Sequence, residues 1–165
     1  MGLDPGLGAT GYGLVDSDGQ DLRSIAFGVI TTKPDCVLAA RLYQLHQQLH
    51  ELLVRFSPDV VVIEQLFFGN NSRTAIVVGQ ARGVLLLATA ENNLPTAEYT
   101  PMQVKQAITG YGQADKRQMQ RMVALLLKLN EIPHPDDAAD ALAIAICYIN
   151  STRMATLIQE QGGAR

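Results

Sequence analysis

Apolar and polar positions along the chain follow two different periods, one typical of strands and the other of helices. Residues 11–16 and 23–30 are apolar and rich in β-prone side chains, and a turn-forming cluster at 17–20 separates them. Together with the short apolar start of the chain, these segments predict three antiparallel strands in a meander. From residue 37 to residue 56, apolar side chains recur at the spacing of an amphipathic helix.

After this helix, the pattern predicts two short strands separated by a helix. Residues 60–63 are four consecutive apolar residues, which is typical of a strand buried inside a sheet. A loop over 65–73 leads into a largely apolar helix over 74–92. A second short strand then ends at Tyr99. The order of these elements predicts an α/β protein with a five-stranded mixed sheet.

The last third of the chain is predicted to be helical. Thr100 suits a helix N-cap, and Pro101 then occupies the first helical position. Residues 115–129 have the pattern of a basic amphipathic helix, and the mainly apolar segment 136–153 predicts a final helix. We expect a single domain over 1–155 and a flexible tail over 156–165.

Composition places the chain among ordinary globular proteins, with 47% hydrophobic and 18% charged residues among its 165. The two cysteines, Cys36 and Cys147, are far apart, so we expect reduced core thiols in a cytoplasmic protein. We see no basic and apolar leader, and no apolar run reaches the roughly 18 residues that a membrane span requires. At first sight the formal charge of −3 gives no sign of a nucleic-acid-binding protein, a view that changes once the acids are assigned.

Four acids stand at the ends of predicted elements. Asp4 comes immediately before Pro5 and Gly6, where the first strand must end in a tight turn. Glu64 directly follows the apolar strand 60–63. Asp137 and Asp140 are three residues apart and share one face of the final helix.

The acids of the final helix have a structural and a chemical interpretation. An acid near a helix N-terminus gains about 0.3–1 kcal/mol from the helix dipole, which suits Asp136 and Asp137. Asp140 lies one turn further in, between alanines, and a buried carboxylate is costly unless a cation or hydrogen bonds compensate it. The set therefore predicts a site for hard divalent cations with oxygen ligands. Because Asp136 and Asp140 also share a face, chemistry alone leaves the choice between Asp136 and Asp137 open.

The order of strands, helices and acids is that of the RNase H-like fold, and six motifs make the resemblance more specific. Over residues 2–148 the chain resembles the RuvC family of Holliday junction resolvases. Three residues precede Asp4, where the family usually has a longer first strand, so we expect a shortened start. The motifs that carry the resemblance are segments 4–6 with 10–13, 63–67, 79–83, 103–106 and 137–145.

The resemblance implies a Mg²⁺-dependent endonuclease, with Mn²⁺ as a substitute, that uses a two-metal mechanism. The metal-holding residues would be Asp4, Glu64, Asp137 and Asp140, so the resemblance selects Asp137 over Asp136. It also implies a homodimer that makes paired nicks in four-way DNA junctions during homologous recombination and DNA repair. RuvA and RuvB, which drive branch migration, would be its partners.

Basic residues gather in the last third of the chain. Such a stripe gives salt-sensitive attraction to phosphates, although a solvated helix face is the alternative. The resemblance favours Lys105 and Lys116 as the phosphate contacts nearest the cut, and Arg73 would add another from the loop after Glu64. The stripe consists of Lys105, Lys116, Arg117, Arg121 and Lys128.

Two further features predict contacts with DNA and with a second subunit. Phe67 and Phe68 are adjacent, so both cannot face one core, and an exposed ring suits stacking on an unpaired base. The resemblance assigns the stacking role to Phe67 and the packing role to Phe68. Gly79 and Gly83 lie one turn apart in the helix 74–92 and allow close approach at a dimer interface, unless this helix is only a buried core element.

Three alternative functions belong to other classes. Sugar kinases and actin-like ATPases also open with an acid and a glycine-rich hairpin, but they need two such domains, and 165 residues are too few. A catalytically silent junction-binding scaffold would not need all four acids. Another RNase H-like nuclease, for instance one that processes RNA, is disfavoured by Lys105, Lys116 and Phe67.

Overall fold

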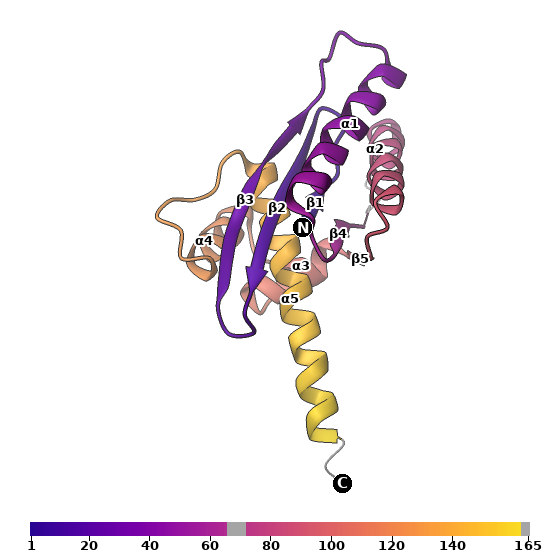
Figure 1. Ribbon diagram of the computed structural model, residues 1–165. Coiled ribbons are helices and arrows are strands. Elements are labelled where there is room, and N and C mark those ends of the chain that lie inside the picture. Colours follow the sequence, from indigo (N-terminus) through magenta and orange to yellow (C-terminus); the bar gives the residue numbers. More distant parts are fainter. Residues whose placement is uncertain (66–71, 163–165) are drawn as a thin grey trace.

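A five-stranded mixed sheet forms the centre of the molecule, with strand order β3-β2-β1-β4-β5 (Figure 1). The computed structural model describes residues 1–65 and 72–162. β2 runs antiparallel to β1 and β3, whereas β1, β4 and β5 are parallel. The expected α/β class with a five-stranded mixed sheet is therefore confirmed. The strands are β1 (Gly2–Asp4), β2 (Ala9–Ser17), β3 (Leu22–Thr31), β4 (Val61–Glu64) and β5 (Thr96–Tyr99).

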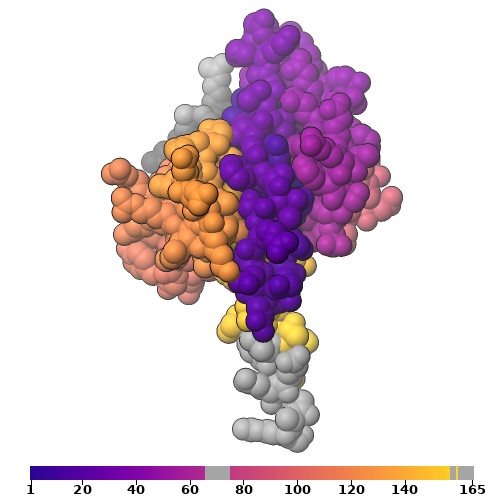
Figure 2. All heavy atoms as spheres, turned by 60° about the vertical axis from the view of Figure 1, so that its left-hand side comes forward, coloured from indigo at the N-terminus to yellow at the C-terminus, as the bar shows by residue number. Residues whose placement is uncertain are grey.

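Helices cover both faces of the sheet. α1 and α2 pack on one face around a core that includes Leu49 and Leu85, while the other three helices enclose a second core around Val123 and Ile144. Figure 2 shows the N-terminal strands as a ridge between these two helical layers. The helices are α1 (Leu38–Phe56), α2 (Ser72–Glu91), α3 (Pro101–Thr109), α4 (Lys116–Leu126) and α5 (Asp136–Gly162).

Strand alternation decides which face each acid occupies. Leu3 and Ile63 belong to the core beneath α1 and α2, whereas Val62 belongs to the core beneath α5. Because successive strand residues point to opposite faces, Asp4 and Glu64 follow Val62 onto the α5 side. Both acids end their strands, and β1 and β4 are parallel neighbours, so the two carboxylates lie at the same edge of the sheet.

Glycines in β2 allow α5 to lie directly on the sheet. A Cβ atom added to Gly11 would stand 1.9 Å from the backbone oxygen of Asp137, and one added to Gly13 would stand 2.6 Å from the backbone nitrogen of Leu142. Any side chain at either position would therefore push the helix away. Since Gly11 pairs with Asp4 across β1 and β2, this close contact brings the start of α5 towards the first acid.

The ends of the last three helices agree only partly with the expectations. Thr100 caps α3 as expected, and its hydroxyl accepts a hydrogen bond from the backbone of Gln103 in a capping box. α5 extends to Gly162, so its expected end near residue 153 is wrong, and 156–162 of the expected tail are helical. This extension projects from the body of the molecule, and the segment 152–156 is exposed (Figure 1). Because the side chains of 152–156 are exposed, this part of the helix has no buried face that an apolar period could have marked in the sequence.

The two cysteines carry free thiols, but they occupy different environments. Cys147 is buried in α5, as expected. Cys36 lies between β3 and α1 and is only partly buried, so the expectation of a core position is wrong for this residue. Across the described part of the chain, the helices are too short or too polar to span a membrane.

Candidate active site

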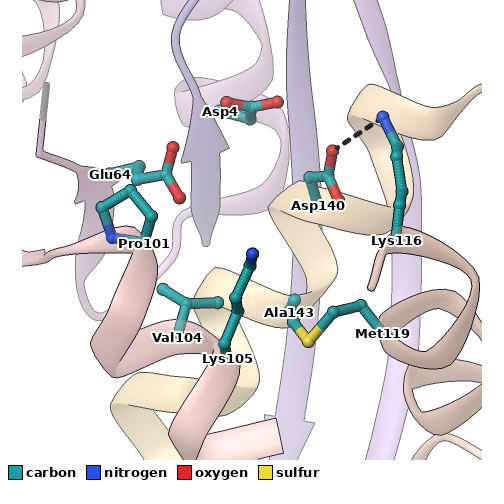
Figure 3. Close-up of a pocket in the computed structure, with 9 residues that line it drawn as sticks. All are labelled: Asp4, Glu64, Pro101, Val104, Lys105, Lys116, Met119, Asp140 and Ala143. Carbon is teal, nitrogen blue, oxygen red and sulfur yellow. Dashed lines mark ion pairs between the residues drawn. The ribbon is translucent and has the colours of Figure 1, made fainter. Parts of the chain in front are cut away.

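Three of the predicted acids line one pocket of about 230 Å³ at the edge of the sheet. Asp4 enters it from the end of β1, Glu64 from the end of β4, and Asp140 from the second turn of α5. Figure 3 shows Glu64 and Asp140 on opposite sides of the pocket, with Asp4 between them. The structure thus brings together carboxylates that are separated by 60 and 76 positions in the sequence.

Apolar and basic side chains complete the pocket. Lys105 of α3 and Lys116 of α4 both line it, so two cations stand beside three acids. Val104, Met119 and Ala143 are buried and form an apolar floor. We did not predict this floor from the sequence. The available signal was helical spacing, because Met119 follows Lys116 by three residues and Ala143 follows Asp140 by three.

The acids of the pocket disfavour one another's charge. Burial, followed by the carboxylates of Glu64, Asp140 and Asp137, raises the pKa of Asp4 to about 8 against an opposing effect of Lys116. Burial likewise raises the pKa of Glu64 to about 7, with a further contribution from Asp140 and an opposing one from Lys105. The pKa of Asp140 is also raised by burial, although Lys116 opposes the shift. Negative charge therefore accumulates here at an energetic cost.

The neighbouring acids Asp136 and Asp137 have different partners. One carboxylate oxygen of Asp136 lies 3.1 Å from the Lys116 ammonium, and the other accepts a hydrogen bond of 2.8 Å from the Gln120 amide. Both hydrogen bonds lower the pKa of Asp136, and the one from Lys116 has the larger effect. Asp137 is half-buried and acts instead on Asp4, whose pKa it raises. Asp136 is thus occupied by Lys116 and Gln120, whereas Asp137 acts on Asp4, and the choice of Asp137 as a metal-holding residue stays a prediction.

Lys116 connects the basic helix to the acid pocket. Its ammonium group lies 3.4 Å from Asp140 as well as 3.1 Å from Asp136. The expected phosphate contact therefore stands directly beside one of the expected metal ligands. Asp136 and Gln120 were not predicted to have a part in this arrangement, because it depends on the packing of α4 against α5.

The donor set of this pocket fits divalent metal ions. Among the residues that the structure describes, no group of three or more acidic, histidine or cysteine side chains is already close enough to share one ion. The carboxylates nevertheless face the same pocket, where burial and then the neighbouring carboxylates raise the pKa of Asp4 and of Glu64 and so disfavour their charged forms. Carboxylate oxygens alone are the ligands that hard cations such as Mg²⁺ prefer.

The remaining predicted DNA contacts have different positions. Arg117 and Arg121 are exposed on α4, the helix that starts with Lys116. The ammonium group of Lys128 instead lies 2.9 Å from the carboxylate of Asp21, at the turn between β2 and β3. Lys128 does not line the acid pocket, unlike Lys105 and Lys116. Phe67, Phe68 and the side chain of Arg73 lie outside the described residues.

The predicted dimer interface falls on the outer surface of α2. Gly79 is partly exposed and Gly83 is exposed, and a Cβ added to Gly83 would meet no heavy atom within 4 Å among the described residues. Two large apolar side chains of this helix are also exposed, Ile76 to 64% and Leu87 to 53%. Since α2 buries only one side against the sheet and α1, it is not merely a core element.

Comparisons with known proteins agree over nearly the whole chain. Residues 1–148 match the family model described as crossover junction endodeoxyribonuclease RuvC. A protein of that name from Thermomicrobium roseum is 52% identical over 157 residues, which cover 95% of this chain and 96% of the relative. A second one, from Syntrophomonas wolfei, is 46% identical over 96% of this chain and 92% of its own.

A solved structure of Thermus thermophilus RuvC shares the fold. It superimposes with a TM-score of 0.86 at 39% identity and covers 94% of this chain and 95% of the Thermus chain. This agreement confirms the RNase H-like fold expected from the order of the elements. With the match to the family model and the two relatives, it shows that this chain belongs to the RuvC family of crossover junction endodeoxyribonucleases.

Proposed function

We propose that this protein resolves four-way DNA junctions by paired, metal-dependent nicks during homologous recombination and DNA repair. The observation that carries the proposal is the pocket in which Asp4, Glu64 and Asp140 face two lysines. A structure of T. thermophilus RuvC in complex with a Holliday junction substrate, 36% identical to this chain with a TM-score of 0.85, supports the choice of substrate.

Asp4, Glu64 and Asp140, with Asp137 beside them, would hold two Mg²⁺ ions, and Mn²⁺ would substitute. When bound, such ions supply an activated water on one side of the phosphate and positive charge for the leaving oxygen on the other. The protein contributes buried carboxylates whose charges repel one another. Cation binding would relieve this repulsion and stabilise the deprotonated carboxylates.

Lys105 and Lys116 would bind the phosphates on either side of the cut. Both ammonium groups belong to the same pocket as the acids, and Lys116 is held beside Asp140 by Asp136. Arg117, exposed on the same helix, would extend this contact along the DNA backbone. Such contacts carry no base specificity, so they fix the position of the strand rather than its sequence. Arg73 and the ring of Phe67 would add a backbone contact and a base-stacking contact.

A homodimer would match the two-fold symmetry of a four-way junction. One acid pocket per chain makes one nick, so two nicks in opposing strands require two chains. The exposed glycine and apolar side chains of α2 are the surface that we assign to this interface. Membership of the family also leads us to propose RuvA and RuvB as the branch-migration partners.

Single-turnover cleavage of labelled substrates tests the proposal. Wild-type protein with Mg²⁺ should cut a synthetic four-way junction, and it should leave linear duplex and RNA–DNA hybrid largely intact. Asp4→Asn, Glu64→Gln and Asp140→Asn should each abolish cleavage while junction binding in Ca²⁺ persists. Preferential cleavage of the hybrid would favour an RNA-processing nuclease, and binding without cleavage by the wild type would favour a junction scaffold.

A further inference from the structure

The turn that follows Asp4 is held by a buried hydroxyl group. Residues 5–8 connect β1 to β2, and Thr10 lies just beyond them with none of its surface exposed. The Thr10 hydroxyl donates a hydrogen bond of 2.5 Å to the carbonyl oxygen of Gly6. The oxygen of the Thr10 hydroxyl in turn accepts a longer hydrogen bond, of 3.4 Å, from the backbone N–H of Gly6. Both hydrogen-bonding groups of Gly6 are thus tied to a single side chain.

A second threonine holds the rest of this turn. The Thr32 hydroxyl, almost completely buried, donates to the carbonyl oxygen of Leu7 at 2.5 Å, and the Thr32 backbone N–H donates to that of Gly8 at 3.2 Å. Arg41 of α1 then donates from Nε to the Thr32 hydroxyl at 2.9 Å. Three successive carbonyl groups are therefore held, the first by Thr10 of β2 and the next two by Thr32, which directly follows β3. We call Thr10, Thr32 and Arg41 the turn brace.

The turn brace touches the backbone beyond Asp4 rather than its carboxylate. Thr10 pairs with Ile30 across β2 and β3, and Ile30 belongs to the core beneath α1 and α2. The side chain of Thr10 therefore lies on the face of the sheet opposite the acid pocket. Any effect of Thr10 on the chemistry must pass through the position of the Asp4 turn.

We propose that Thr10 is a positioning residue that holds Asp4 in the acid pocket against the repulsion of the other carboxylates. Asp4 stands at the last residue of a three-residue strand, so β1 itself fixes it weakly. The charges of Glu64, Asp140 and Asp137 all act on Asp4. A turn without its brace would let the Asp4 carboxylate move away from them, and the geometry needed to share a metal ion would be lost. This inference rests on the proposed function.

The test compares variants that differ in a single hydroxyl group. Thr10→Val keeps the shape of the side chain and removes the hydroxyl, whereas Thr10→Ser keeps the hydroxyl. Thr89→Val is a matched control, because the fully buried Thr89 also donates to a backbone carbonyl, that of Leu85, within α2 on the face of the sheet opposite the acid pocket. The measurements are the Mg²⁺ concentration that gives half-maximal single-turnover junction cleavage and Mn²⁺ binding to the DNA-free protein by calorimetry.

We expect Thr10→Val to raise the half-saturating Mg²⁺ concentration by about 10- to 100-fold, as is usual when the support of a metal ligand is removed. Excess Mg²⁺ should restore most of the maximal rate, and Mn²⁺ binding should weaken in parallel wherever it is measurable. Thr10→Ser and Thr89→Val should resemble the wild type. A Mg²⁺ dependence of Thr10→Val that matches that of Thr89→Val would overturn the inference, as would a loss of rate that excess Mg²⁺ does not restore.

Two further variants keep the outcome decisive. If Thr10→Val does not fold by circular dichroism, Thr32→Val takes its place, and a Mg²⁺ dependence like that of the wild type would then overturn the role of the brace. Asp4→Asn separates this inference from the proposed function. Normal cleavage by Asp4→Asn would refute the proposed function itself, whereas an inactive Asp4→Asn beside an unchanged Thr10→Val would refute only the positioning role.

Discussion

Replacing Asp4 by Asn should stabilise the metal-free protein while it abolishes cleavage. Burial and the neighbouring carboxylates raise the pKa of Asp4 from 3.8 to about 8 in the folded state. An acid with a raised pKa in the folded state binds its proton more tightly there than in the unfolded state. Its contribution to stability is therefore fully present below the unfolded-state pKa, and it is lost as the pH rises towards the folded-state pKa. Asp4 therefore destabilises the metal-free protein increasingly between about pH 4 and pH 8, and an amide at this position does not.

The size of the effect follows from the shift. Each pKa unit corresponds to about 1.36 kcal/mol, so a rise from 3.8 to about 8 sets an upper bound of about 6 kcal/mol at pH 8. Water at the pocket mouth and side-chain rearrangement reduce such penalties, and we expect about 2–3 kcal/mol at pH 8 and less than about 1 kcal/mol at pH 5. For a chain of this length, the melting temperature should rise by about 5–10 °C at pH 8 and about 2 °C at pH 5.

Thermal unfolding in a chelating buffer at pH 5 and pH 8 measures this difference. Asp136→Asn is the control, because Asp136 is exposed, and the hydrogen bond from Lys116 lowers its pKa. Because this pKa is lowered rather than raised, the charged Asp136 contributes to the stability of the folded state. Any small effect of Asp136→Asn should therefore be a loss of stability, and this loss should fade as the pH falls. An Asp4→Asn variant that melts at or below the wild-type temperature at pH 8 would contradict the reasoning. So would a gain that is equal at both pH values.

Three other measurements address the basic residues, the ion and the subunit interface. Lys105→Ala should lower the salt-dependence slope of junction binding by about 1, and an unchanged slope would exclude a phosphate contact. Ca²⁺ should support junction binding but not cleavage, because its larger and looser shell holds the reacting groups less well; robust cleavage in Ca²⁺ would contradict this. Gly83→Leu should shift the protein towards monomers in sedimentation velocity. Gln113→Leu is the surface control, because Gln113 is exposed and its neighbour Ala114 belongs to the core on the other face of the sheet. A Gly83→Leu dimer as stable as the wild type would place the interface elsewhere.

The local pattern of the sequence was sufficient to place the strands and two of the acids. Glu64 follows four apolar residues, and Asp4 precedes Pro5 and Gly6, so both could be assigned to strand ends from their neighbours alone. Their common edge then follows from parallel pairing of β1 and β4. Locally determined features of this kind were predictable because they depend on the next few residues only.

Features that depend on packing between distant elements were not predictable. The separate partners of Asp136 and Asp137 arise because α4 places Lys116 and Gln120 beside one acid and not the other. Gly11 belonged to a recognised motif, but its contact with the backbone of Asp137 needs the position of α5. The helical continuation of α5 beyond residue 153 was missed for the opposite reason, because the exposed segment 152–156 has no buried face to leave a periodic pattern.

Cleavage of a supercoiled plasmid that carries an extruded cruciform, by wild-type protein mixed with an excess of Glu64→Gln, tests the central claim most directly. If each acid pocket makes one nick and two chains act as a pair, wild-type protein alone should yield mainly linear plasmid. Mixed dimers should then convert the product to singly nicked circles in proportion to the added Glu64→Gln. Linear product that persists in full at a large excess of the inactive variant, or linear product from Glu64→Gln alone, would contradict the assignment of one catalytic pocket to each chain.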